Sequence, residues 1–132
     1  MSLVSRISLC VAENEIDALG HVNNARFLEY LERGRMDWYN RCNPSLNSFT
    51  GHGLGTVVVR MEINYRRECF SGAQLSVLTR AHSRGRKSYV LQQEIYNNED
   101  ECVCDAMVTS VIMDMNARTT AYLPESLAEQ FA

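Results

Sequence analysis

The sequence predicts an α+β protein in which one antiparallel sheet packs against a single long helix. An apolar stripe with helical period predicts the helix, because four residues fall at offsets 0, 4, 7 and 11: Phe27, Leu31, Gly34 and Trp38. Residues 56–67 predict a long half-buried strand, because apolar and polar side chains alternate there. The later segments are joined by short polar turns, so neighbouring strands should run antiparallel. One layer of helix on one layer of sheet is the α+β arrangement.

The remaining elements follow from the same two periods. We expect the first strand at residues 6–11 and the helix over about residues 23–42. Four more strands are expected at residues 56–67, 73–82, 87–97 and 102–115, and a short helix after Pro124, at residues 124–131. No repeat, low-complexity tract or linker interrupts them, so residues 1–132 are expected to form one domain with a five-stranded sheet.

Gly34 is unusual on the apolar stripe of the helix. Glycine in a helix interior costs about 1 kcal/mol relative to alanine, so its presence predicts a place where the sheet approaches the helix closely. The helix should stop before Pro44, because the residue that precedes a proline is pushed out of the helical region.

The composition excludes several classes of protein. With 13 Lys and Arg against 16 Asp and Glu, the formal net charge of -3 argues against a dedicated nucleic-acid binder with a broad basic face. The first residues lack the pattern of a secretory signal, and no apolar run approaches the roughly 18 residues that suggest a membrane span. Five cysteines in such a chain are expected to be reduced. We therefore expect a cytoplasmic protein with no nucleic-acid or membrane partner.

Cys102 and Cys104 do not predict a metal site. No second pair of cysteines or histidines with zinc spacing accompanies them. We expect them to be buried thiols, whose small apolar side chains suit a core.

The sheet is expected to contact a second subunit. A single helix covers only one face of a five-stranded sheet, yet residues 102–113 are apolar on nearly both faces. The other face or the edge of the sheet should therefore meet another copy, as a homodimer or homotetramer.

A polar segment, "DALGHVNN" at residues 17–24, stands directly before the helix. The first N–H groups of a helix have no partner within the helix and form a positive pole. That pole can stabilise the negative charge that develops on a carbonyl oxygen during acyl transfer. A carboxylate beside it, Asp17, can attack the carbonyl or deprotonate a water that does so. No "GxSxG" serine elbow competes for this role.

A structural interpretation of the same segment stands beside the catalytic one. Asp17 or Asn23 can simply cap the helix, because their side-chain oxygens accept hydrogen bonds from the first N–H groups. His21 alone is more often structural than catalytic, and Gly20 is typical of a tight turn.

Residues 17–35, "DALGHVNNARFLEYLERGR", strongly resemble the signature of the hotdog-fold acyl-CoA thioesterases of the 4-hydroxybenzoyl-CoA thioesterase family. "HVNNARFLEYLE" is particularly similar to the bacterial long-chain acyl-CoA branch. Residues 57–77 and 83–97 also resemble strands of that family. The resemblance implies a hotdog fold, in which a curved antiparallel sheet wraps round the helix, and oligomers with active sites between subunits.

The resemblance also implies the roles of individual residues in a thioester hydrolase. The family's catalytic carboxylate corresponds to Asp17 and its helix-start backbone donor to Asn24, while His21 and Asn23 would shape the site. No metal or redox cofactor is needed, because coenzyme A is part of the substrate. Many relatives with aromatic substrates carry a bulky residue where Asn23 and Asn24 stand, which argues against a hydroxybenzoyl substrate.

A basic hairpin, "SRGRKS" at residues 83–88, is the candidate contact for the nucleotide of coenzyme A. In related enzymes this end of the ligand lies near surface loops. The candidate phosphate ligands are Arg84, Arg86, Lys87 and Ser88. The alternative is an ordinary solvated turn, and Arg66 with Arg67 is a second, weaker candidate for the anionic end.

Two other functions fit the same motif. One is a thioesterase whose acyl donor is an acyl carrier protein, so that the basic hairpin binds acidic side chains. The other is a non-catalytic module that binds acyl thioesters. Retention of the acid and of the helix-start motif argues against the second.

Overall fold

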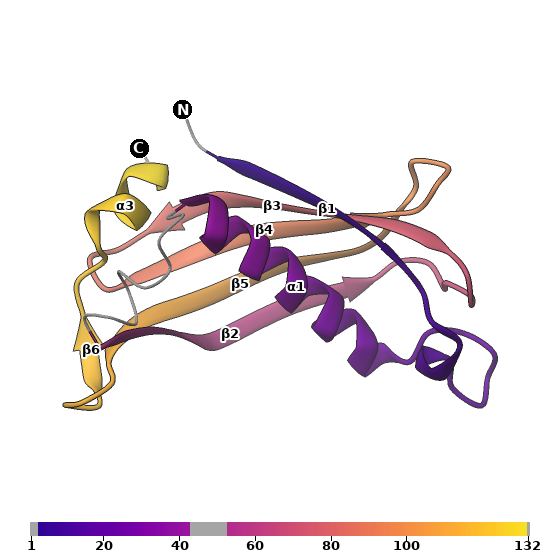
Figure 1. The fold of residues 1–132 in the computed structure, drawn as a ribbon, viewed down its shortest axis with the longest axis horizontal. Helices are drawn as coiled ribbons and strands as arrows, with labels where there is room; N and C mark the ends of the chain where they lie inside the picture. Colours follow the sequence, from indigo (N-terminus) through magenta and orange to yellow (C-terminus); the bar gives the residue numbers. More distant parts are fainter. Residues whose placement is uncertain (1–2, 43–52, 132) are drawn as a thin grey trace.

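The computed structural model describes residues 3–42 and 53–131. In chain order these form β1 (Val4–Cys10), a 3₁₀ turn (Glu13–Glu15), α1 (Asn24–Cys42), β2 (Leu54–Tyr65), β3 (Gln74–Arg84), β4 (Ser88–Tyr96), β5 (Cys102–Asp114), β6 (Thr119–Ala121) and α3 (Glu125–Ala128), which continues as a 3₁₀ turn (Glu129–Phe131) (Figure 1). Every element expected from the sequence is present. The expected helix stop at Pro44 falls in residues 43–52, outside the described residues.

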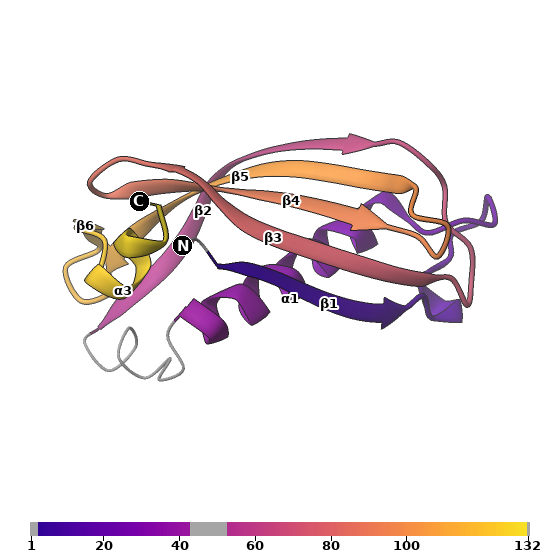
Figure 2. The same ribbon diagram turned by 90° about the horizontal axis from the view of Figure 1, so that it is seen from above.

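The strands form one antiparallel sheet in the order β1-β3-β4-β5-β2. The sheet curves over α1, which lies along one of its faces (Figure 2). The sixth strand, β6, corrects the expected count of five. It pairs with Ile112–Asp114 of β5, beyond the last β4 pair at Val111. Three residues without alternating apolar positions leave no period for a sequence to show.

Helix α1 approaches the sheet closely at Gly34, as the sequence predicts. A Cβ atom at this position would lie 2.6 Å from Cγ1 of Val77 and 3.0 Å from Oγ1 of Thr79, both on β3. Glycine is therefore required for contact between the two layers, and its low helix propensity is offset by the packing that it allows.

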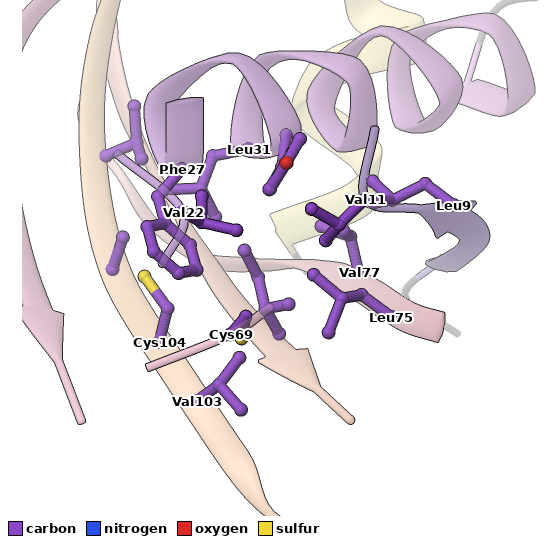
Figure 3. Close-up of a cluster of buried hydrophobic side chains, with 14 residues drawn as sticks. Leu9, Val11, Val22, Phe27, Leu31, Cys69, Leu75, Val77, Val103 and Cys104 are labelled. Atoms are coloured by element: carbon purple, nitrogen blue, oxygen red, sulfur yellow. The ribbon is translucent and has the colours of Figure 1, made fainter. Parts of the chain in front are cut away.

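The apolar stripe of α1 is buried as expected. Phe27 and Leu31 pack into a cluster near the start of the helix, with Val22, Leu75 and other core residues (Figure 3). Trp38 belongs to a second cluster near the helix C-terminus. Burying each large apolar side chain contributes about 1.5–3 kcal/mol, so the first cluster holds the helix start in place.

One detail of β2 differs from the expected alternation. A register shift around Val59 places Val57 opposite Val111, whereas Met61 pairs with the fully buried Val108. The expectation of unbroken alternation over residues 56–67 is therefore wrong, because the extra residue of a β-bulge inverts the alternation. The bulge leaves Val59 57% exposed on an edge strand.

No helix among the described residues is long and apolar enough to cross a membrane.

The contact at Gly34 gives a stability prediction. Gly34→Ala forces a methyl group into Val77, and such overpacking costs about 1–3 kcal/mol. That is more than the roughly 1 kcal/mol that alanine gains in an unhindered helix. Urea unfolding should show lower stability for Gly34→Ala. The control, Arg33→Ala on the exposed side of α1, should stay within about 0.5 kcal/mol of the parent. Equal or higher stability of Gly34→Ala would contradict the close approach.

Candidate active site

The residues from Ile16 to Val22 form a tight turn ahead of α1. Ile16 and Val22 form an antiparallel bridge, and inside it the Asp17 N–H donates to the His21 carbonyl at 2.9 Å. The Gly20 N–H donates to the Asp17 carbonyl at 3.0 Å, and Gly20 has φ of 88°. Glycine adopts this left-handed conformation without strain, so the turn needs Gly20.

The Asp17 carboxylate is held by its own turn and stays partly accessible. Its Oδ1 accepts a 2.9 Å hydrogen bond from the Leu19 N–H. The His21 Nε2 lies 3.8 Å from the same oxygen, and both side chains are 26% exposed. The carboxylate therefore has a defined direction beside an imidazole, and a ligand can reach it from solvent.

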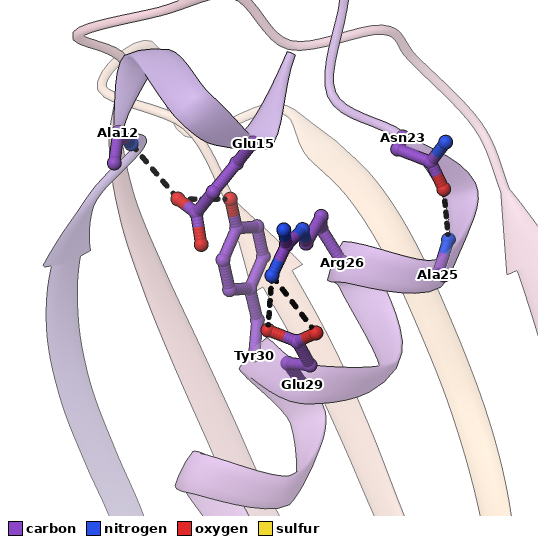
Figure 4. Close-up of polar contacts among 7 residues, drawn as sticks. All are labelled: Ala12, Glu15, Asn23, Ala25, Arg26, Glu29 and Tyr30. Carbon is purple, nitrogen blue, oxygen red and sulfur yellow. Dashed lines mark hydrogen bonds and ion pairs between the residues drawn. The ribbon is translucent and has the colours of Figure 1, made fainter. Parts of the chain in front are cut away.

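The helix start combines one capped and one open donor. Oδ1 of Asn23 accepts a 2.9 Å hydrogen bond from the Ala25 N–H, so Asn23 caps the helix (Figure 4). For the Asn24 N–H no acceptor is found among the described residues. The Asn24 carbonyl accepts from the Tyr65 hydroxyl at 3.3 Å. The backbone donor that the family resemblance assigns is thus the one whose hydrogen remains open to a ligand.

Val22 attaches this polar segment to the core. Its side chain is fully buried, and its N–H donates to the Cys69 carbonyl at 2.8 Å. A hydrogen bond to the loop between β2 and β3 therefore holds the turn against the core.

The nearby thiols are unsuited to nucleophilic attack. Burial raises the pKa of Cys69 to about 11 and that of Cys104 to about 12. Both stay protonated near pH 7, whereas the thiolate is the reactive form. Cys104 is buried as expected, while Cys102 is only half-buried. Among the described residues no group of three or more His, Cys, Asp or Glu could hold a metal ion.

The basic hairpin between β3 and β4 lies at the opposite end of the sheet from the loop that precedes α1 (Figure 1). It joins β3 to the start of β4, whereas the turn that contains Asp17 lies beside the loop after β2, near the end of β4. The nine residues of β4 extend over about 27 Å. Within one chain, the structure brings together Asp17, His21, Asn23 and Asn24 and separates them from the hairpin.

The cations of the hairpin are exposed, and no described carboxylate forms an ion pair with them. Arg84, Arg86 and Lys87 all face solvent. The Lys87 Nζ lies 5.1 Å from the ring centroid of Tyr122, a cation–π contact. Ser88 is half-buried at the start of β4. The three charges are therefore available to an anion.

Arg66 and Arg67 lie at the same end of the sheet as the turn that contains Asp17, but each already forms an ion pair with a carboxylate. Arg66 forms an ion pair with Asp105, and Arg67 lies 3.2 Å from a carboxylate oxygen of Glu101. Their charges are largely balanced within the chain, which makes them weaker phosphate ligands than the hairpin.

Two further residues beside this turn, Glu15 and Tyr30, carry only a weak sequence signal. The hydroxyl of Tyr30 donates to the carboxylate of Glu15 at 2.9 Å (Figure 4). The only hint was a tyrosine at the edge of the apolar stripe and an acid two positions before Asp17.

A family model confirms the expected class of protein. The model described as the thioesterase-like superfamily matches residues 11–131. The chain belongs to the thioesterase-like superfamily. The prediction of a thioester hydrolase is thereby confirmed at the level of the family.

Individual relatives of this superfamily agree with that assignment. The long-chain acyl-CoA thioesterase FadM of Escherichia coli (strain K12) is 34% identical over 116 residues, which cover 87% of each chain. The crystal structure of YbaW, a probable thioesterase from Escherichia coli, matches at 33% identity and a TM-score of 0.83, covering 96% of this chain and 95% of that one.

A more distant structure confirms the fold alone. The hypothetical protein SAV2348 from Staphylococcus aureus, solved in complex with CoA, has a TM-score of 0.90 at 15% identity. The match covers 98% of this chain and 82% of the SAV2348 chain. The predicted hotdog fold of this thioesterase superfamily member is therefore confirmed.

Proposed function

We propose that the protein hydrolyses acyl-CoA thioesters to a free acid and coenzyme A. One observation carries this proposal: a partly exposed carboxylate, Asp17, lies in the turn that leads to an open helix-start N–H, that of Asn24. Hydrolysis of a thioester needs both groups. The carboxylate starts the attack on the carbonyl carbon, and the N–H stabilises the negative charge that develops on the carbonyl oxygen. The likeness to FadM, named as a long-chain acyl-CoA thioesterase, supports the choice of substrate.

The reaction uses the two groups together. The thioester carbonyl oxygen accepts the hydrogen bond of the Asn24 N–H, and the carbonyl carbon faces the Asp17 carboxylate. The carboxylate either attacks the carbon directly or takes a proton from the attacking water. In both routes negative charge develops on the carbonyl oxygen, the C–S bond breaks, and the sulfur leaves as a thiolate. In the water route, the hydroxyl group of the attacking water remains on the acid, and the proton taken up by Asp17 passes to the thiolate. In the direct route, an anhydride forms between Asp17 and the acyl group, the thiolate takes a proton from solvent, and water hydrolyses the anhydride to the free acid. One oriented donor of this kind contributes about 2.7–4 kcal/mol in a known protease.

His21 and Asn23 support the reacting groups in this proposal. His21 lies beside the Asp17 carboxylate and limits the directions from which a ligand can approach that carboxylate. The Asn23 side chain accepts the hydrogen bond of the Ala25 N–H. The N–H of Asn24 is then the one that remains to donate to the ligand.

The proposed active form is a homodimer joined along β2. This strand lies at the edge of the sheet, and among the described strands none pairs with its outer side. Val58, Val59 and Tyr65 are each more than 40% exposed along it. A long exposed edge strand is normally protected in native proteins, and a second copy with two-fold symmetry covers it by antiparallel pairing.

The proposed dimer brings the basic hairpin to the active site. Antiparallel pairing of the β2 strands turns the partner end for end, so its hairpin lies toward the end that carries Asp17. Arg84, Arg86, Lys87 and Ser88 of the partner subunit would then bind the phosphates of the coenzyme A whose thioester reaches Asp17. Their exposure and lack of described ion-pair partners support this role.

The central test of activity is Asp17→Asn. The amide keeps an Oδ1 acceptor for the Leu19 N–H but cannot act as base or carboxylate nucleophile. Thiol release from a panel of acyl-CoA esters should fall by about 10²–10⁴-fold with an unchanged melting temperature. Asp100→Asn, in the turn between β4 and β5, is the matched control and should keep full activity. Near-normal turnover of folded Asp17→Asn would rule out this mechanism.

A second test concerns the hairpin. Replacing Arg84, Arg86 and Lys87 together by Ala should raise KM for acyl-CoA at least tenfold, because charge-assisted phosphate contacts are lost. KM for acyl-pantetheine esters, which lack the nucleotide, should change little. The control replaces the exposed Arg33 and Arg41 of α1 by Ala. An equal rise of KM for both kinds of ester would argue against phosphate contact, and preferred hydrolysis of carrier-protein thioesters would assign the hairpin to a protein donor.

A further inference from the structure

Glu15 connects three segments around the active site. Its Oε1 accepts hydrogen bonds from the Ala12 N–H at 2.8 Å and from the Tyr30 hydroxyl at 2.9 Å (Figure 4). Its backbone carbonyl accepts from the Asn23 N–H at 3.1 Å. One residue thus links the segment that follows β1, helix α1 and the residue that caps the helix.

The Tyr30 hydroxyl is a fixed and permanent donor to Glu15. The tyrosine is fully buried on α1, and its ring packs edge-on against Phe27 with centroids 5.9 Å apart. Burial, together with the neighbouring Glu15 carboxylate, raises the pKa of Tyr30 well above its usual range. The hydroxyl therefore stays protonated, and its bond to a carboxylate is of the stronger, charge-assisted kind.

Glu15 lies near both proposed reacting groups in the sequence and connects them to the buried face of α1. Glu15 stands two residues before Asp17, and its partner Asn23 stands directly before Asn24. The tip of the turn that contains Asp17 is exposed, since Leu19 is 82% exposed. Packing against the core therefore does not fix the position of this tip. The bond between Tyr30 and Glu15 attaches the root of this turn to the buried face of the helix whose start carries the Asn24 donor.

We infer that Glu15 and Tyr30 are positioning residues for the proposed thioesterase reaction, an inference that rests on the proposed function. Neither contacts the thioester. Their hydrogen bond sets the distance between the Asp17 carboxylate and the Asn24 N–H. A misplacement of about 1 Å in an active site can reduce the rate by about 10²-fold, so the loss of one remote hydroxyl is sufficient to impair turnover.

The test removes a single oxygen atom. Tyr30→Phe should lower kcat for acyl-CoA hydrolysis by at least tenfold and leave KM within about twofold, because binding groups are untouched. Tyr39→Phe is the matched control. It removes another buried tyrosine hydroxyl from the same helix, one that is hydrogen-bonded to Tyr89 at the far end of α1. It should cost similar stability and leave kcat unchanged.

Rescue by a conservative variant separates positioning from folding. Glu15→Gln retains an oxygen that can accept from Tyr30 and Ala12 and should keep most of the activity. Glu15→Ala should lose as much kcat as Tyr30→Phe. Equal kcat values for Tyr30→Phe and Tyr39→Phe, or an effect confined to KM, would overturn the inference.

A readout without turnover keeps this inference distinct from the proposed function. Hydrogen exchange of the Asn23 N–H, which is bonded to Glu15, should accelerate at least tenfold in Tyr30→Phe and not in Tyr39→Phe. Unchanged exchange overturns the positioning role whether or not the protein is a thioesterase. Full activity of Asp17→Asn with accelerated exchange in Tyr30→Phe would instead overturn only the proposed reaction.

Discussion

Helix α1 can lie close to the sheet because Gly34 carries no side chain, and the rest of the molecule depends on that contact. A Cβ atom there would lie 2.6 Å from Val77. The close approach lets Phe27 and Leu31 fill the core near the helix start. A helix packed this way has a fixed start as well as a fixed axis, so its first N–H groups have a defined direction. The donor at Asn24 is a consequence of how the helix is buried.

The crowded polar segment before α1 is compatible with a core because one apolar residue within it is buried. Val22 is fully buried and bonded to Cys69, so its neighbours can remain at the surface. Asp17 is then available on one side of this anchor and Asn24 on the other. The two interpretations of the segment, a helix cap and the proposed reaction site, apply to different residues. Asn23 caps Ala25, while Asn24 keeps an open donor and Asp17 an accessible carboxylate.

The periodic features of the fold could be predicted from the sequence, while features that depend on single contacts could not. The helix stripe, the long strands and the close approach at Gly34 all produce a regular or costly pattern. The three-residue β6 and the bulge at Val59 produce none. In the proposed site, Asp17 and Asn24 were predicted from one contiguous motif, and their catalytic roles stay a prediction. The bond between Glu15 and Tyr30 joins residues 15 positions apart, and spacing along the chain does not reveal it. Nor does spacing reveal that the basic hairpin lies at the far end of the sheet.

The central claim is that each active site takes its acid from one chain and its cations from another. Subunits carrying Asp17→Asn should be mixed, after reversible unfolding, with subunits in which Arg84, Arg86 and Lys87 are Ala, and assayed at low acyl-CoA concentration. Half of randomly formed dimers are mixed, and each contains one intact site of two, so activity should recover to about a quarter of the parent value. Activity that stays at the mean of the two separate variants would contradict the claim.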